Sequence, residues 1–202
     1  MPEFSIVMSV FQPWWPIEYS LACVAAQSFE DWELLVVPDG EPDKFAKKQV
    51  EKLVLKWNHR IRLIDCPRRE GCWGNLARNT GTHEATGRYI CWVNHDNLIF
   101  PDYLKRHMQN FQKMKDGNGI SIVPIHLKHR GDHFGHYPKD RIRLAGIDLL
   151  NFSMPTRVAQ EIDAFGEKHA EIYEADWLLY QRASQTLEVR IDDCKTPAGI
   201  HF

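Results

Sequence analysis

The sequence lacks three features that would assign it quickly to a class of protein. It has no basic excess, since 25 Lys and Arg against 27 Asp and Glu give a formal net charge of -2, so its charge does not predict nucleic acid binding. It has no stretch of about 20 apolar residues, the length that spans a bilayer. Its five cysteines are odd in number and contain no Cys-x-x-Cys pair, which argues against a disulfide framework and fits a reducing compartment.

The amino-terminal run Phe4–Phe11 is apolar but short, and it is preceded by Glu3 without any basic residue, so it makes a poor signal peptide. We therefore expect a cytoplasmic protein, for which the composition neither requires nor forbids peripheral contact with a membrane. With 202 residues, 44% of them hydrophobic, the chain is long enough for one domain with a full core. We expect a single domain over residues 1–202.

Strand patterns and helix patterns alternate along the chain, which predicts an α/β fold with a mostly parallel sheet and helices on both faces. The predicted helix at 75–86 ends at Gly87, which we expect to act as its C-terminal glycine. Strands are predicted at 4–11, 32–37, 61–64, 89–93, 120–127, 147–152 and 187–191, and helices at 17–27, 43–57, 75–86, 103–114, 158–165 and 174–184.

The strand at 89–93 is the one that predicts a site. Its apolar run stops at Asn94, His95, Asp96 and Asn97. A carboxylate at the carboxyl end of such a strand lies where open α/β sheets bind ligands, and oxygen ligands suit a hard divalent cation that carries a diphosphate. The alternative is a polar turn between a strand and a helix, with Asn97 as a capping residue.

Several segments, in matching order and spacing, resemble family 2 glycosyltransferases of the GT-A fold. The resemblance extends over residues 1–115, and the last third is similar only at 174–177, where Glu-Ala-Asp-Trp resembles the Glu-Asp-Trp of the family. The matching segments are Ser-Ile-Val-Met-Ser-Val-Phe at 5–11, Val-Val-Pro-Asp-Gly at 36–40, Ala-Arg-Asn-Thr-Gly at 77–81, Ala-Thr-Gly-Arg-Tyr-Ile at 85–90, Val-Asn-His-Asp-Asn at 93–97 and Pro-Asp-Tyr-Leu at 101–104.

This resemblance implies a GT-A domain in which residues 1–115 bind a nucleotide-sugar and residues 116–202 bind the acceptor. It implies Mn²⁺ or Mg²⁺ at Asp96, with the late His201 completing the metal site. Asp176 would be the general base, with Glu174 as its competitor. The donor-binding residues would be Ser9, Phe11, Asp39, Arg78, Asn94, His95 and Asp96.

The activity so implied is inverting transfer of a sugar from a nucleoside diphosphate, with UDP as the expected carrier, to a hydroxyl of a glycan or lipid-linked acceptor, as in polysaccharide biosynthesis. Central to it is the expectation that Asp39 and Asp96 leave adjacent parallel strands and hold opposite ends of one donor. The family carries an aspartate where this chain has Asn94, a change that lowers the expected affinity for a cation.

Other interpretations stay open at this point. Asp39 also fits an ordinary Pro-Asp-Gly turn, Arg78 a surface salt bridge, and Glu174 and Asp176 acids in the first turn of a helix. Asn94, in place of the family's aspartate, is compatible with a binding module that has lost turnover. A sugar nucleotidyltransferase is a further alternative, but it would need a Gly-rich phosphate loop that residues 12–15 do not offer.

Two further groups of residues are candidates for contact with sugars. A histidine-rich loop that starts around Leu127 is expected to cover the acceptor site rather than to hold zinc, because no cysteine lies nearby. The indoles of the tryptophans fit either stacking on a sugar or base, or burial in the core. The residues concerned are His126, His129, His133, His136, Tyr137 and Arg141 in the loop, and Trp14, Trp15 and Trp73 elsewhere.

Overall fold

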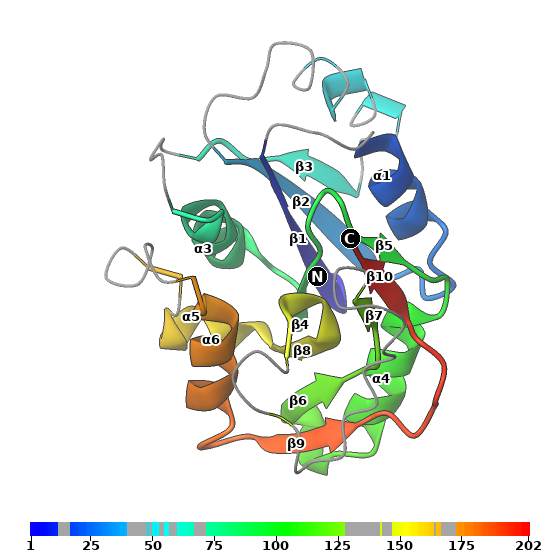
Figure 1. Cartoon of the computed structure of the whole chain (residues 1–202), viewed down its shortest axis with the longest axis vertical. Coiled ribbons are helices and arrows are strands. Elements are labelled where there is room, and N and C mark those ends of the chain that lie inside the picture. The colour runs from blue at the N-terminus through cyan, green and yellow to red at the C-terminus, as the bar shows by residue number, and fades with distance from the viewer. Residues whose placement is uncertain are drawn as a thin grey trace.

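The fold is a central sheet with helices on both faces (Figure 1). The computed structural model describes residues 1–11, 17–39, 48, 50–52, 55–56, 60–66, 72–127, 142, 147–163, 165–166 and 173–202. Within these residues the main sheet has seven strands in the order β3-β2-β1-β4-β8-β6-β9. The strands are β1 (Phe4–Val10), β2 (Trp32–Pro38), β3 (Ile61–Leu63), β4 (Tyr89–Trp92), β6 (Gly119–Ile122), β8 (Phe152–Pro155) and β9 (Glu188–Ile191).

The pairing of these strands is mostly parallel, as predicted. β3, β2, β1 and β4 run parallel to one another, and β6 runs parallel to β9. Only β8 is reversed, because it pairs antiparallel with both β4 and β6. Every residue of β1 is buried, as expected for a central strand covered on both sides.

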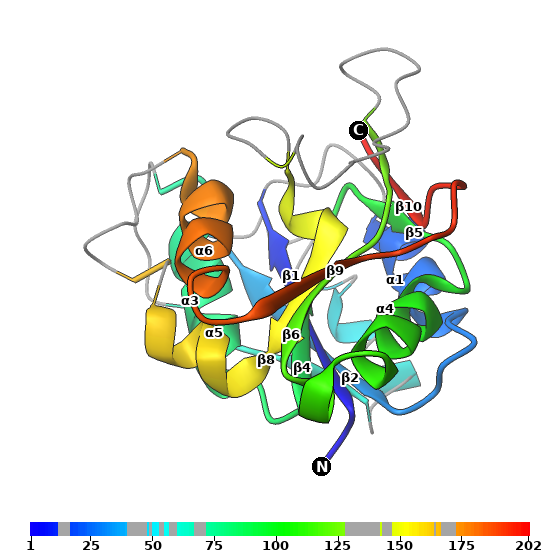
Figure 2. The same ribbon diagram turned by 90° about the horizontal axis from the view of Figure 1, so that it is seen from below.

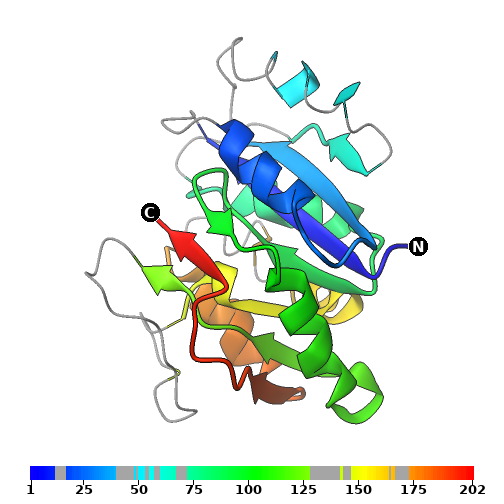
Figure 3. The same ribbon diagram turned by 90° about the vertical axis from the view of Figure 1, so that its right-hand side faces the viewer.

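Successive residues of β1 point into two different cores. Phe4, Ile6 and Met8 pack with helices α1 (Ile17–Ala25) and α4 (Tyr103–Gln112), while Val7 packs on the opposite face. That face is covered by α3 (Asn75–Glu84), α5 (Thr156–Ile162) and α6 (Ala175–Ala183). Figure 2 shows the two helical layers on either side of the sheet, and Figure 3 shows the blue α1 and the green α4 in front of it.

The end of α3 differs from its prediction. The helix stops at Glu84, and its C-cap residue is Ala85 in an extended conformation, so Gly87 is not a left-handed C-terminal glycine. Gly87 is needed for a different reason. A Cβ there would lie 2.6 Å from the backbone nitrogen of Ser5, so only glycine allows the chain to pass this close to β1.

The segment predicted as a strand over 147–152 is also different. Residues Leu149–Asn151 form a 3-10 turn, and the strand β8 begins only at Phe152. The cause is a capping box, in which Oδ1 of Asp148 accepts from the Leu150 N–H (2.9 Å) and Oδ1 of Asn151 accepts from the Asp148 N–H (3.0 Å). Side chains that bond the backbone locally compete with a sheet ladder in this way.

The strand predicted over 120–127 is divided between β6 and a short β7 (His126–Leu127). Most of the helix predicted over 43–57 lies outside the described residues, as do Trp14, Trp15, Tyr137, Arg141 and the histidines at 129, 133 and 136.

A second, small sheet, which was not predicted from the sequence, places the carboxyl-terminal residues beside segments from the middle of the sequence. Its order is β5-β10-β7, with β5 at Leu98–Ile99 and β10 at Gly199–His201. In Figure 3 the red β10 lies between two green segments. The segment before β10 is anchored by Arg106, which pairs with Asp192 and donates to the Thr196 carbonyl (2.9 Å). His201 is thereby held beside the chain that follows Asp96.

Among the described helices, none combines the length and apolar composition needed to cross a membrane.

Candidate active site

Three parallel strands end at the same edge of the sheet, and each delivers a polar side chain there. β1 brings Ser9, β2 is followed directly by Asp39, and β4 leads into Asn94 and Asp96. The ladder continues past the strand ends, since the Asp39 N–H donates to the Val10 carbonyl (2.8 Å). Asp39 and Asp96 therefore leave strands that flank β1, with one strand between them, rather than adjacent strands as expected. The carboxyl edge of a parallel sheet is where open α/β folds bind ligands.

Arg78, on α3, lies at the centre of this edge. Its Nη1 donates to the Trp73 carbonyl (2.8 Å) and to Oδ1 of Asn75 (3.0 Å), and its Nη2 donates to Oδ1 of Asn94 (3.1 Å). Its Nε is buried and has no hydrogen-bond partner among the described residues. An orphaned guanidinium donor is a fitting contact for a phosphate or carboxylate oxygen.

The charges of four carboxylates act on this guanidinium. Burial lowers the pKa of Arg78, while the charges of Asp148, Asp176, Asp39 and Asp96 act to raise it. The four acids come from four separate segments of the chain, so the fold has gathered them. A site with four carboxylates and one arginine has an excess of negative charge, which suits a cation together with its anionic ligand.

Asn94 stands at the position of the family's first metal-motif aspartate, but its amide oxygen is already used within the protein. Oδ1 accepts from Oγ of Ser9 (3.0 Å) and from Arg78. Ser9 and Asn94 therefore position the arginine, and the Ser9 hydroxyl, predicted to contact the donor, is directed at Asn94.

Asp96 remains as the carboxylate at this strand end. Its Oδ1 is buried without a hydrogen-bond partner among the described residues. A buried carboxylate oxygen with no donor is costly unless a ligand or cation satisfies it. Within the described residues no three His, Cys, Asp or Glu side chains converge as a ready-made metal site. An ion held here by one or two protein side chains would therefore take its remaining ligands from water and from a bound phosphate, as Mg²⁺ commonly does.

Asp148 is the site residue that sequence reasoning missed. Its Oδ2 lies 2.8 Å from Nδ1 of His201. Burial alone would raise the pKa of Asp148, but the hydrogen bond and charge of His201, the Leu150 N–H and Arg78 lower it overall. In the same way burial lowers the pKa of His201, and the hydrogen bond and charge of Asp148 together with Asp96 raise it overall. The only signal in the sequence was the Asp-x-x-Asn capping spacing, which says nothing about a partner 53 positions away.

Asp176 lies in the first turn of α6 and has the electrostatics of a general base. Burial and the charge of Asp148 raise its pKa from 3.8 to about 6, against the opposing effects of the Trp177 N–H (2.7 Å) and Arg78. A carboxylate with a pKa near working pH is suited to accepting a proton. Glu174, its predicted competitor, is exposed at the N-cap position and makes no capping hydrogen bond.

The remaining predicted residues lie at the edges of this arrangement. Burial raises the pKa of Asp39, opposed by Arg78 and by a hydrogen bond from the Gly74 N–H. Phe11 is 52% exposed, just beyond β1. His95 is buried, its N–H donates to the Ser9 carbonyl (3.3 Å), and its own carbonyl accepts from Ser20 (2.5 Å). The backbone of His95 thus joins β1 to α1.

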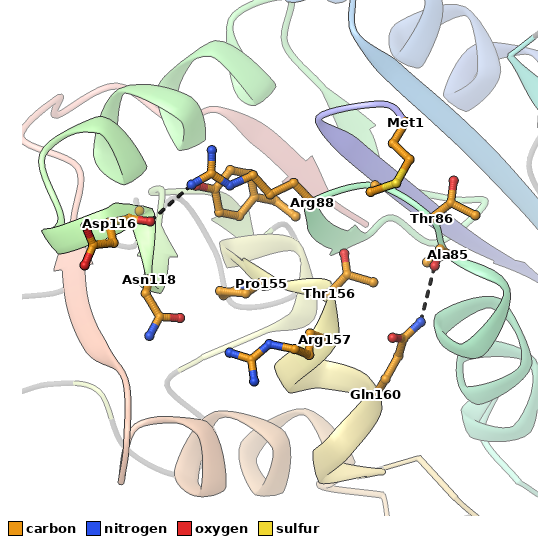
Figure 4. Close-up of a pocket in the computed structure, with 13 residues that line it drawn as sticks. Met1, Ala85, Thr86, Arg88, Asp116, Asn118, Pro155, Thr156, Arg157 and Gln160 are labelled. Atoms are coloured by element: carbon orange, nitrogen blue, oxygen red, sulfur yellow. Dashed lines mark hydrogen bonds between the residues drawn. The ribbon is translucent and has the colours of Figure 1, made fainter.

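A separate cavity of about 380 Å³ lies at the opposite edge of the sheet (Figure 4). It is lined by the segment that precedes β4 and by the start of α5, where Gln160 donates to the Ala85 carbonyl (3.2 Å) and Arg88 to the Asp116 carbonyl (3.1 Å). None of the residues predicted for the site lines this cavity, so it is distinct from the cluster around Arg78.

Comparison with known proteins identifies the family. The family model described as glycosyl transferase family 2 matches residues 5–166. The chain belongs to this family. The resemblance inferred from the segments in the first 115 residues is thereby confirmed, and the match extends beyond them to the end of α5 and past it.

Individual relatives are more distant. WfgD of Escherichia coli, a UDP-Glc:alpha-D-GlcNAc-diphosphoundecaprenol beta-1,3-glucosyltransferase, is 29% identical over 119 residues, which are 59% of this chain and 43% of WfgD. An uncharacterized glycosyltransferase of Rickettsia bellii is 23% identical over 82% of this chain and 25% of its own length. This chain thus spans less than half the length of either relative.

Solved structures confirm the GT-A fold. Staphylococcus aureus TarS 1-349 in complex with UDP-GlcNAc superposes with a TM-score of 0.74 at 15% identity, over 98% of this chain and 58% of that one. The mannosyltransferase PcManGT from Pyrobaculum calidifontis, in complex with GDP-Man and Mn²⁺, superposes with a TM-score of 0.73 at 14% identity, over 99% of this chain and 56% of that one.

Proposed function

We propose that this family 2 glycosyltransferase chain moves a sugar from a nucleoside diphosphate, with UDP as the carrier, to an acceptor hydroxyl, with inversion at the anomeric carbon. The observation that carries the proposal is that Nε of Arg78 and Oδ1 of Asp96 are buried without hydrogen-bond partners among the described residues, where the charges of Asp39, Asp96, Asp148 and Asp176 all act on Arg78. Structural packing has no need of four acids that act on one buried arginine, whereas a cation, a diphosphate and an acceptor proton together do.

Residues at this edge of the sheet would contact different parts of the donor. Asp39, which accepts from the Gly74 N–H, would accept from the nucleoside. Arg78, through its unused Nε and its planar fork, would contact the diphosphate oxygens. Asn94 holds that fork by accepting from Nη2, and Ser9 holds Asn94 by donating to the same amide oxygen.

Asp96 and His201 are the residues that would hold Mn²⁺ or Mg²⁺, and they fit the ion in two respects. Oδ1 of Asp96 is buried without a donor, and the charge of Asp96 acts on the His201 ring. When bound, the divalent ion supplies charge stabilisation for the departing diphosphate. Asp148 would orient His201, because its Oδ2 lies 2.8 Å from Nδ1 of the ring, and a carboxylate on the Nδ1 side leaves Nε2 for a metal.

Asp176 would take the proton of the acceptor hydroxyl as that oxygen attacks the anomeric carbon on the face opposite the departing diphosphate. Its pKa of about 6 leaves it ionised at neutral pH, yet basic enough to accept a proton. A single displacement of this kind inverts the anomeric centre.

The relatives support UDP as carrier and a lipid-linked acceptor. WfgD is named for a UDP-glucose donor and a GlcNAc-diphosphoundecaprenol acceptor, and TarS binds UDP-GlcNAc. We extend to this chain a UDP-sugar donor and an acceptor that carries a sugar on a lipid diphosphate.

The test begins with a thermal-shift screen of UDP, GDP and CDP, each with and without Mn²⁺, since a ligand that binds the folded state raises its melting temperature. We expect UDP with Mn²⁺ to give the largest shift, and Asp96→Ala to remove the metal-dependent part. Asp193→Ala, at an exposed acid, is the matched control and should behave as the parent.

The second step is release of UDP from UDP-glucose and UDP-GlcNAc, measured with Mn²⁺ present. Slow, metal-dependent release supports catalysis, because water can stand in for the acceptor. A shift with UDP but no release from either donor would instead support a binding module without turnover. No shift with any nucleotide would refute the proposal.

A further inference from the structure

Trp73 adopts a backbone conformation that a tryptophan does not favour. Its φ is 52°, in the left-handed region, and Gly74 follows with φ 78°. Glycine adopts such angles without steric cost and asparagine with little, but a bulky side chain there is strained. Trp73 is also 61% exposed, so burial in the core does not explain its presence. Neither the local backbone nor packing accounts for an indole at this position.

The indole has one aromatic neighbour among the described residues, and that neighbour is also exposed. The ring of Tyr173 meets it edge to face, with centroids 5.2 Å apart and planes at 77°. Tyr173 is 70% exposed. The two residues are 100 positions apart in sequence, and we call them the aromatic pair. The fold thus brings two large rings together at the surface and leaves most of their area in solvent.

The aromatic pair is attached to the candidate active site from both sides. The Trp73 carbonyl accepts from Nη1 of Arg78, and the next N–H, that of Gly74, is donated to the carboxylate of Asp39. Tyr173 lies in the turn that leads into α6, three residues before Asp176. The loop that carries Trp73 is therefore bonded to the proposed donor-binding residues, and the turn that carries Tyr173 leads to the proposed base, Asp176.

We propose that the aromatic pair binds a pyranose ring of the acceptor saccharide, an inference that rests on the proposed transfer reaction. Aromatic faces suit the apolar C–H face of a sugar, and the rim of the sugar remains free for hydrogen bonds. A protein partner requires roughly 800 Å² on each side, far more than two rings supply. The strain at Trp73 is then the cost of presenting an indole next to the transfer site, as backbone outliers at functional sites often are.

Trp73→Gly and Trp73→Asn test this without unfolding the protein. Both replacements accept φ 52° more readily than tryptophan, so neither melting temperature should fall below that of the parent. Tyr173→Ala removes the other ring, and Tyr19→Ala, an exposed aromatic on α1, is the matched control.

The readout is saturation-transfer NMR with the methyl glycosides of glucose, N-acetylglucosamine and mannose, each in the presence of UDP and Mn²⁺. We expect at least one glycoside to bind the parent and the Tyr19→Ala variant equally. Its affinity should fall about tenfold in each Trp73 variant and in Tyr173→Ala, the factor typical of losing one aromatic contact.

Two outcomes would overturn the inference: no glycoside binds the parent, or the Trp73 variants bind as the parent does. Failure of the proposed function looks different, because it is the absence of any UDP-induced thermal shift in the parent chain. If a glycoside binds through the aromatic pair but UDP gives no thermal shift, the pair is a saccharide-binding site and the proposed transfer reaction is refuted.

Discussion

Replacing Asp176 with asparagine should make the protein more stable while removing its transfer activity. The carboxylate is held in a partly buried position beside Asp148, and both features favour its neutral form. Asparagine is neutral, has nearly the same shape and keeps the Oδ1 acceptor for the Trp177 N–H. It cannot take a proton from an acceptor. A site that stores unfavourable electrostatics for catalysis gains stability when the charge is removed.

The size of the gain follows from the pKa. A rise from 3.8 to about 6 corresponds to up to about 3 kcal/mol of disfavoured ionisation above pH 6. Because the folded state holds the proton more tightly than the unfolded state, the contribution of Asp176 to stability falls as the pH rises from 3.8 through 6. The advantage of the asparagine variant should therefore be up to about 3 kcal/mol at pH 8 and about half of that at pH 5.

Urea unfolding of both proteins at pH 8 and pH 5, followed by fluorescence, measures these differences. Glu174→Gln, at an exposed acid two residues away, is the control and should change the free energy of unfolding by less than about 0.5 kcal/mol at either pH. An asparagine variant that is less stable than the parent at pH 8, or an advantage that does not shrink on acidification, would show that the carboxylate is not strained in its charged form.

Three more outcomes are expected from the same structure. The acid limb of kcat/KM for sugar transfer should lie near pH 6, where Asp176 becomes protonated; a limb near pH 4 would argue against this residue as the base. Asp148→Asn should weaken Mn²⁺ binding, measured by electron paramagnetic resonance, about 10- to 100-fold, because Oδ1 keeps the Leu150 N–H and the NH2 group that replaces Oδ2 cannot accept from His201; unchanged affinity would separate His201 from the metal. Gly87→Ala should destabilise the fold by about 1–3 kcal/mol in urea, because its Cβ would lie 2.6 Å from the Ser5 backbone nitrogen; a variant as stable as the parent would contradict the close approach.

Much of the sheet could be predicted from the sequence, because its signals are local. Strands β1, β2 and β4 are runs of apolar residues that end abruptly at polar ones, and each change falls within two or three residues of the observed boundary. The same boundaries place Asp39 and Asp96 just after the ends of their strands. Because parallel strands have their carboxyl ends at one edge of the sheet, both residues could be predicted to lie at that edge. The family was equally accessible, because its motifs lie in and between these elements.

The long-range contacts were decided only by the tertiary structure. Asp148 and His201 meet through a capping turn and strands of two or three residues, which leave almost no periodic signal in a sequence. The use of the Asn94 amide by Ser9 and Arg78 depends on three segments converging. The pairing of Trp73 with Tyr173 spans 100 positions. Local patterning specifies where the chain is buried, but which distant side chains share one small volume is set by the packing of the whole chain.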